Sequence, residues 1–265
     1  MFNPRLGASI HTISTCIDDN IIKLVADSKI KTIELSQHLF LENMEYMKTQ
    51  IKKLSVSGIK VASVHVNYRG FDISAANEKT RREAICNTFE AIALAEEFNA
   101  PILVMHASLE PIKIEERAER KKYAKESILE IAEKCEKTDK RLAIEILPRT
   151  CLGNTVDELM ELTAEAPEDI VGFCLDTNHL MDKPFILADT VKTFGKRLIA
   201  THLSDYDGID EKHMIPGAGV LDWKAFMNAL KEINYTGPFN FECVFDKDKL
   251  PEERINMLEK SYDYL

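Results

Sequence analysis

The chain alternates short apolar runs with longer helix-like patterns along its whole length. Strands of a parallel sheet are buried on both faces, so they read as near-continuous apolar runs, as Ile102-Leu103-Val104-Met105 does. The expected strands are residues 6–11, 31–35, 60–66, 101–107, 141–147, 171–176, 198–203 and 238–244. The expected helices are residues 18–29, 41–57, 76–99, 113–137, 155–165, 184–194, 222–233 and 251–264. Eight βα units predict an α/β protein, a single (β/α)8 TIM barrel domain over residues 1–265.

Local residue choices support these helices and disfavour another α/β fold. Thr155 with Glu158 predicts a capping box, and Asp222 predicts a helix N-cap. The alternative fold, an open doubly wound sheet, normally carries a Gly-rich phosphate loop after its first strand. The segment Leu6-Gly7-Ala8-Ser9-Ile10-His11 is not such a loop, which favours the closed barrel.

Composition restricts the environment and the partners of the chain. The formal net charge of 34 − 44 = −10 disfavours a nucleic-acid partner, because phosphate binding depends on Lys and Arg. No apolar stretch is long enough to cross a bilayer, and the first residues lack a secretory signal pattern, so we expect a cytoplasmic protein. The six cysteines form no Cys-x-x-Cys pair and are expected to be free, mostly buried thiols.

Four polar residues each end an apolar run in the second half of the chain. These residues are Glu145, Asp176, His202 and Glu242. In a barrel, the carboxyl ends of the strands share one rim, so the four side chains should meet there. Three adjacent buried carboxylates need a positive counter-charge, and no Lys or Arg ends a strand in this half. We therefore expect a divalent metal ion, although any one of these residues alone could be a capping or hydrogen-bonding residue.

Six of the seven histidines, all but His38, fall at or just beyond an expected strand end. The candidates for substrate contact are His65, His106, His179 and His213, and a structural role for each stays open. His11 is expected on the first strand and His38 on the surface or in a loop. Arg149 follows the fifth strand, where it could orient Glu145, touch substrate or form a salt bridge in the loop.

An oxygen-rich ligand set with one imidazole favours Mn²⁺, Mg²⁺ or Co²⁺, with Zn²⁺ as an alternative because further histidines lie close by. Such an ion can chelate adjacent oxygens of a hydroxy-ketone and stabilise the enediolate that forms on proton loss. Two carboxylate ligands could then act as acid and base on opposite faces of the substrate. The residues therefore favour proton transfer next to a carbonyl.

The chain resembles the xylose isomerase-like barrel superfamily of sugar isomerases, epimerases and apurinic endonucleases. The most specific segments are residues 175–179 (Leu-Asp-Thr-Asn-His), 201–208 (Thr-His-Leu-Ser-Asp-Tyr-Asp-Gly) and 213–223, which holds His, Pro-Gly-x-Gly and Asp-Trp. The last is similar to a segment of predicted sugar phosphate isomerases. In related ketose epimerases the matching Glu, Asp, His and Glu bind one divalent ion. The resemblance thus implies that Glu145, Asp176, His202 and Glu242 are metal ligands, that Glu145 and Glu242 are the catalytic acid/base pair, and that His179 contacts substrate.

Two positions depart from the ketose epimerase pattern. Gly208 stands where those enzymes carry an arginine, and Cys151 stands where they carry a second glutamate. The substrate and the epimerised carbon are therefore open, and so is the choice between epimerase and aldose-ketose isomerase. The metal set is unaffected.

The endonuclease branch of the superfamily uses nine residues to hold three zinc ions. The positions that align with them are His65, His106, Glu145, Asp176, His179, His202, Glu211, His213 and Glu242, with Glu211 in place of an aspartate. The net charge of −10, the Pro-Gly-x-Gly segment and the lack of evident basic DNA-reading loops favour a small sugar or sugar phosphate. The other possible functions are a 3-keto-sugar lyase or hydratase and a non-catalytic carbohydrate-binding or partner subunit. Whether the protein forms a homo-oligomer is also open.

Overall fold

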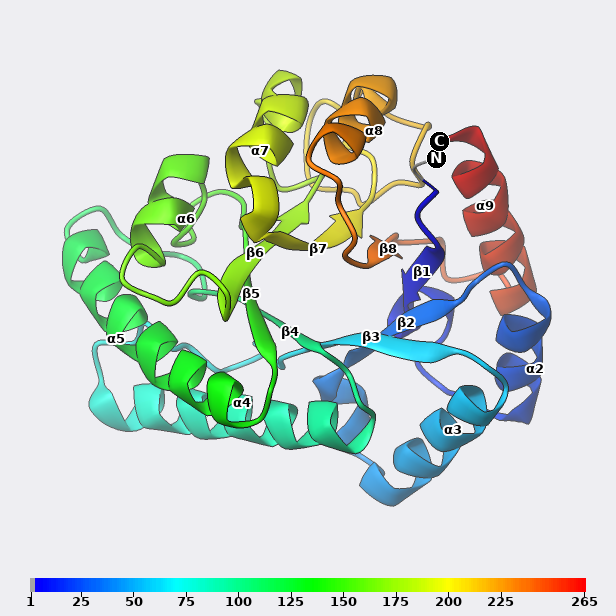
Figure 1. The fold of residues 1–265 in the computed structure, drawn as a ribbon, viewed down its shortest axis with the longest axis horizontal. Helices are drawn as coiled ribbons and strands as arrows, with labels where there is room; N and C mark the ends of the chain where they lie inside the picture. Colours follow the sequence, from blue (N-terminus) through cyan, green and yellow to red (C-terminus); the bar gives the residue numbers. More distant parts are fainter. Residues whose placement is uncertain (1–2) are drawn as a thin grey trace.

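The computed structural model describes residues 3–265, in which eight parallel strands close into a barrel. Each strand pairs with the next along the chain, and β1 pairs with both β2 and β8. The strands are β1 (Leu6–Ser9), β2 (Thr32–Ser36), β3 (Lys60–His65), β4 (Ile102–Met105), β5 (Arg141–Glu145), β6 (Val171–Asp176), β7 (Leu198–Leu203) and β8 (Phe239–Phe241). Figure 1 shows them at the centre of a ring of helices. The predicted (β/α)8 fold is confirmed.

Eight longer helices surround the strands within the described part of the chain, and all overlap the predicted ones. They are α2 (Asp19–Asp27), α3 (Met44–Val56), α4 (Glu78–Glu97), α5 (Arg117–Lys137), α6 (Val156–Leu162), α7 (Leu187–Phe194), α8 (Trp223–Glu232) and α9 (Pro251–Tyr264). Three short elements were not predicted: α1 (Ile10–Ile13) and the 3₁₀ helices η1 (Gln37–Phe40) and η3 (Gly195–Arg197). A further 3₁₀ helix, η2 (Pro184–Ile186), forms the first turn of the helix predicted over residues 184–194. Elements this short leave little periodic pattern in a sequence.

The first predicted strand was too long, which misplaced His11. β1 ends at Ser9, and the next residues form α1, in which Ile10 and Ile13 are fully buried at helical spacing. His11 therefore lies on a helix at the barrel rim and not on a strand. Its Nδ1 is 2.8 Å from Ser36 Oγ, so the histidine still faces the strand carboxyl ends. His38 is half-buried in η1.

The two predicted helix caps are present, but one predicted hydrogen bond is not. Thr155 Oγ1 accepts from the Glu158 amide at 3.2 Å, and Asp222 Oδ1 accepts from the Ala225 amide at 2.9 Å. The Glu158 carboxylate does not return to the Thr155 amide, because Arg117 Nη2 donates to it at 2.8 Å. The predicted capping box is therefore only half formed, because the Glu158 carboxylate pairs with Arg117 and not with the Thr155 amide.

The interior of the barrel carries an apolar layer directly below the candidate site. Ala143, Cys174 and Ala200 belong to one buried cluster with Ile102, Val104 and Ile199. They lie two residues before Glu145, Asp176 and His202, and residues two apart on a strand share a face. Small apolar side chains therefore fill the barrel and leave the polar ones at its carboxyl rim.

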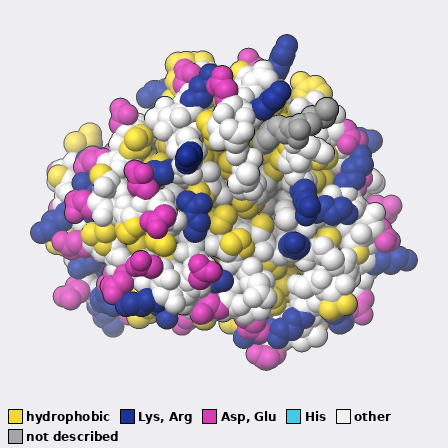
Figure 2. All heavy atoms as spheres, viewed as in Figure 1, with side chains coloured by type: hydrophobic (Ala, Val, Ile, Leu, Met, Phe, Trp, Pro, Cys, Tyr) yellow, Lys and Arg dark blue, Asp and Glu magenta, His cyan; other side chains and the backbone are white. Residues whose placement is uncertain are grey.

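The opposite end of the barrel has a different chemical character. Figure 2 shows this face, where Lys, Arg, Asp and Glu side chains are interspersed around a hydrophobic hollow and no histidine is visible. A cavity of about 980 Å³ lies here, and residues such as Ile59, Phe98 and Tyr235 line it. Its described lining holds no Asp, Glu or His, so it lacks the carboxylates and imidazoles that gather at the other end of the barrel. No described helix combines the length and apolarity that a membrane span requires.

Candidate active site at the carboxyl rim of the barrel

The four residues expected to converge do meet in the structure. Glu145 ends β5, Asp176 ends β6, His202 lies near the end of β7 and Glu242 directly follows β8. Each offers one ligand atom, and these atoms lie within 4.8 Å of one another. Glu145, Asp176 and His202 are at most 1% exposed, while the Glu242 side chain is 16% exposed. The parallel register brings the strand ends to one rim, where Asp176 is the partner of His202.

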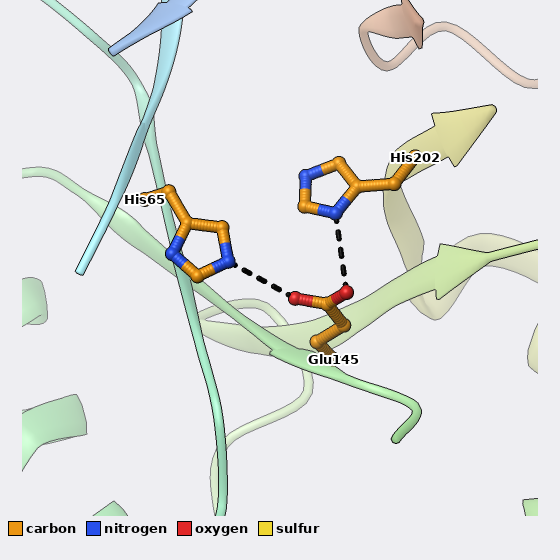
Figure 3. A group of neighbouring side chains, drawn as sticks. All are labelled: His65, Glu145 and His202. Carbon is orange, nitrogen blue, oxygen red and sulfur yellow. Dashed lines mark hydrogen bonds and ion pairs between the residues drawn. The ribbon is translucent and has the colours of Figure 1, made fainter. Parts of the chain in front are cut away.

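Glu145 lies at the centre of the cluster. Its Oε1 is 3.2 Å from His202 Nδ1, and its Oε2 is 3.2 Å from His65 Nε2 and 3.3 Å from His106 Nε2. Figure 3 shows Glu145 between the rings of His65 and His202. The second glutamate, Glu242, places Oε2 at 2.7 Å from His202 Nδ1 and Oε1 at 3.4 Å from His11 Nε2. In each glutamate one oxygen contacts His202, while the other contacts His65 and His106 in Glu145 and His11 in Glu242.

A second group lies beside the first and includes Asp176, His179 and His213. His179 Nε2 is 3.7 Å from Asp176 Oδ2 and 3.5 Å from Glu211 Oε1, and His213 Nε2 is 3.1 Å from the same Glu211 oxygen. All four histidines predicted to contact substrate therefore line the site. Their positions also allow ligand roles, because imidazole is a common metal ligand.

Backbone carbonyls fix the ring orientation of two of these histidines. His65 Nδ1 is 2.9 Å from the Val66 carbonyl oxygen, and His179 Nδ1 is 2.9 Å from the Ile146 carbonyl oxygen. A carbonyl oxygen only accepts, so each Nδ1 carries a hydrogen. In each ring Nε2 faces the carboxylates, where it donates a hydrogen bond when the ring is protonated and holds the lone pair when the ring is neutral.

The segment after β7 brings Glu211 and His213 to the site. The amide and carbonyl of Asp205 pair with Met214 at 2.7 and 3.1 Å, which closes the intervening loop. Arg149 reaches this loop from the end of β5, with Nη1 at 2.6 Å from Glu211 Oε2 and Nη2 at 3.0 Å from Asp210 Oδ1. Of the three roles considered for Arg149, the structure shows the salt bridge.

Sequence reasoning missed Glu34, a buried carboxylate in the middle of β2. Glu34 is 1% exposed, and its Oε1 is 3.0 Å from His202 Nε2. The hydroxyls of Ser9 and Ser63 donate to its two oxygens at 2.9 and 2.7 Å. The available signal was a glutamate inside the apolar run of an expected buried strand, where an unpaired charge is unfavourable.

The histidines and carboxylates shift one another's ionisation. Burial alone lowers the pKa of His65, but contact with Glu145 raises it to about 9. Burial opposes protonation of His179 as well, yet Asp176 and Glu211 raise the pKa of its imidazole to about 10. For Glu145, burial favours the neutral acid, but His202 and the other histidines hold its pKa well below the ordinary range. Protonated histidines therefore supply positive charge to these carboxylates.

Asp176 differs from the four glutamates of the site because its pKa is raised and theirs are lowered. Burial raises its pKa above the ordinary value, and His179 and His213 offset this only in part. Its Oδ2 is fully buried and has no hydrogen-bond partner within residues 3–265. Of the three groups of described residues that could hold an ion, two include this carboxylate. A bound cation would satisfy the orphaned oxygen, so the residues present fit a divalent metal.

The profile of the family described as xylose isomerase-like TIM barrel matches residues 22–261. The chain belongs to this family. D-psicose 3-epimerase of Enterocloster bolteae is 30% identical over 113 residues, which cover 42% of this chain and 36% of that protein. Inosose isomerase of Bacillus velezensis is 24% identical over 216 residues, which cover 78% of this chain and 73% of that protein.

Solved structures share the whole fold at low sequence identity. A D-tagatose 3-epimerase-like protein superposes with a TM-score of 0.81 at 20% identity, over 98% of this chain and 97% of that one. The IOLI protein with a binding zinc atom gives a TM-score of 0.80 at 18% identity, over 97% and 96% of the two chains. The matched region with an uncharacterised Sinorhizobium fredii protein, 34% identical, spans only 38% of that protein's length. These structural similarities establish the barrel, and the activity has to be argued from the site.

Proposed function

We propose that the protein is a divalent-metal-dependent isomerase or epimerase of a sugar or sugar phosphate. The convergence of Glu145, Asp176, His202 and Glu242, with one buried Asp176 oxygen left unpaired, carries this proposal. Oxygen-rich ligands with one imidazole suit Mn²⁺, Mg²⁺ or Co²⁺, and the neighbouring histidines also suit Zn²⁺. Relatives named as a psicose epimerase and inosose isomerases support chemistry at a carbon next to a carbonyl.

Glu145 and Glu242 are the proposed acid/base pair. When bound, the ion would polarise the substrate carbonyl and stabilise the enediolate charge. Glu145 Oε2 and Glu242 Oε1 point away from His202, and each is the oxygen from which a proton would be exchanged with the substrate. His65 and His106 face Glu145 Oε2, and His11 faces Glu242 Oε1. Each glutamate can therefore exchange its proton with a histidine that the other glutamate does not contact through that oxygen. Burial of the cluster keeps water from competing for that proton.

The test combines metal analysis with solvent exchange. The purified protein is assayed for bound Mn²⁺, Co²⁺ and Zn²⁺, then incubated in deuterated water with free ketoses, inososes and phosphorylated ketoses. We expect one substrate to take up deuterium at the carbon next to its carbonyl. Glu145→Gln should reduce exchange by at least about 100-fold, because a proton-transfer group contributes roughly 10² to 10⁴ in rate.

Glu110→Gln is the matched control for that variant. It makes the same chemical change on an exposed rim carboxylate, 3.6 Å from Arg149, and should keep wild-type exchange. A fully active Glu145→Gln would end the acid/base assignment. Loss of water from a 3-keto sugar, without exchange into an epimer, would support a lyase or hydratase instead.

A zinc-dependent phosphodiesterase acting on abasic DNA is the second candidate. All nine positions aligned with the endonuclease pattern lie at this rim, and Glu211 contacts both His179 and His213. Incision of an abasic oligonucleotide at catalytic enzyme concentration would establish that activity. An intact oligonucleotide after prolonged incubation with Zn²⁺-loaded protein would remove it.

A further inference from the structure

We propose that Glu34 is a positioning residue that sets which nitrogen of His202 faces the metal site. This inference rests on the metal site of the proposed function and extends it to a residue on the opposite side of the barrel. Glu34 belongs to β2, whereas the four proposed ligands come from β5 to β8. It is not a member of any described group whose atoms could hold an ion.

The two nitrogens of His202 face different partners. Nε2 is 3.0 Å from Glu34 Oε1 and 3.1 Å from Glu34 Oε2, so the carboxylate faces this nitrogen with both oxygens. Nδ1 is 2.7 Å from Glu242 Oε2 and 3.2 Å from Glu145 Oε1, at the proposed ion site. An ionised carboxylate only accepts hydrogen bonds, so Nε2 carries a hydrogen whenever it bonds Glu34. The lone pair of the neutral ring is then on Nδ1 and points toward the proposed ion.

Glu34 is held in place by hydroxyl groups from the two neighbouring strands, and one of these hydroxyls is itself held from β8. Ser9 on β1 donates to Oε1 at 2.9 Å, and Ser63 on β3 donates to Oε2 at 2.7 Å. Asn240 on β8 in turn donates to Ser9 Oγ at 2.8 Å. Each carboxylate oxygen therefore has a hydroxyl partner in addition to the imidazole, and the plane of the carboxylate is fixed. Rigid support of this kind fixes the ring of a metal-binding histidine.

A purely structural role does not explain this arrangement. Glu34 and His202 are at most 1% exposed, and a buried ion pair is often no more stabilising than well-packed apolar side chains of similar size. The ring of His65 also stacks on that of His202, with centroids 5.6 Å apart and an interplanar angle of 20°. His202 is thus held on its face and at one nitrogen, and only Nδ1 is directed at the other proposed ligands.

The experiment separates affinity for the ion from stability of the fold. Mn²⁺ binding to metal-stripped wild type, Glu34→Ala, Glu34→Gln and Ser63→Ala is measured by calorimetry. Urea unfolding of the same metal-free proteins is measured in parallel. We expect Glu34→Ala to weaken Mn²⁺ binding by about 10- to 100-fold, as loss of a carboxylate behind a metal-binding histidine does. Glu34→Gln keeps an oxygen that can accept from Nε2, so its affinity should lie between wild type and Glu34→Ala.

Ser63→Ala keeps the carboxylate and removes one of its donors, so it should weaken binding by less than Glu34→Ala while folding normally.

In ¹⁵N-histidine spectra of Zn²⁺-loaded wild type, His202 should show a protected hydrogen on Nε2 and none on Nδ1. Glu34→Ala should lose that protection. Wild-type Mn²⁺ affinity in both Glu34→Gln and Glu34→Ala would overturn the positioning role and leave the metal site standing. Failure of the wild type to bind any ion would overturn both.

Discussion

Asp205 provides the sharpest test of how the rim is held together. It is fully buried just after β7, and its Oδ1 accepts from the amides of Tyr206 and Leu221 at 3.0 and 3.1 Å. Its Oδ2 accepts from the Gly217 amide and the Trp223 indole, both at 2.8 Å. An asparagine would place an NH₂ group against two of these donors. At about 1–3 kcal/mol for each buried donor left without an acceptor, Asp205→Asn should lower the free energy of unfolding by about 2–6 kcal/mol.

The assay is reversible urea unfolding followed by circular dichroism, with thermal melting as a second measure. For a chain of this size, about 1 kcal/mol corresponds to a shift of roughly 2–4 °C, so the melting temperature should fall by on the order of 10 °C. Asp222→Asn is the matched control, because Asp222 is exposed at the start of α8 and asparagine caps helices as well as aspartate does. Equal unfolding midpoints for the two variants would refute the reasoning that the four hydrogen bonds to Asp205 stabilise the segment over residues 206–223.

Three further measurements test other parts of the structure. A Cβ at Gly219 would lie 2.1 Å from the Tyr206 carbonyl oxygen, so Gly219→Ala should lower stability by about 1–3 kcal/mol; an unchanged urea midpoint would contradict that crowding. The pKa of His65 rises from 6.5 to about 9 on folding, so its contribution to the stability of the metal-free protein is complete below pH 6.5 and is lost as the pH rises through 9. Urea midpoints should fall across that window, and a His65→Gln variant should show a shallower fall. Only Cys16 and Cys86 are exposed among the six free thiols, so a thiol reagent should label two groups in the native protein and six in urea; four or more in the native state would show that the core is open.

The sequence was informative where strands end. A polar residue closes the apolar run of each of these strands, and the barrel brings the strand carboxyl ends together, so Glu145, Asp176 and His202 could be grouped without coordinates. Glu242 was found in the same way, although β8 ends at Phe241 and is shorter than the strand expected over residues 238–244. The resemblance to a known family assigned metal-binding and acid/base roles to these residues, and these roles stay predictions.

Glu34 shows where this reasoning stops. A single polar residue in a short apolar run has no periodic partner, and its contact with His202 joins positions 168 residues apart. Only closure of the barrel places β2 across from β7, so the contact cannot be read from either segment alone. The short helix α1 was missed for a related reason, because four residues give too little pattern to distinguish a helical turn from the end of a strand.

The pairing of β1 with β8, which forms the seam of the barrel, has a consequence for folding of the protein. The link from Asn240 to Ser9 crosses this seam over 231 positions of sequence and continues through Glu34 to His202. Contacts so distant along the chain form slowly, because a large loop must close first. Tight binding of the ion during refolding should therefore report that the barrel has closed.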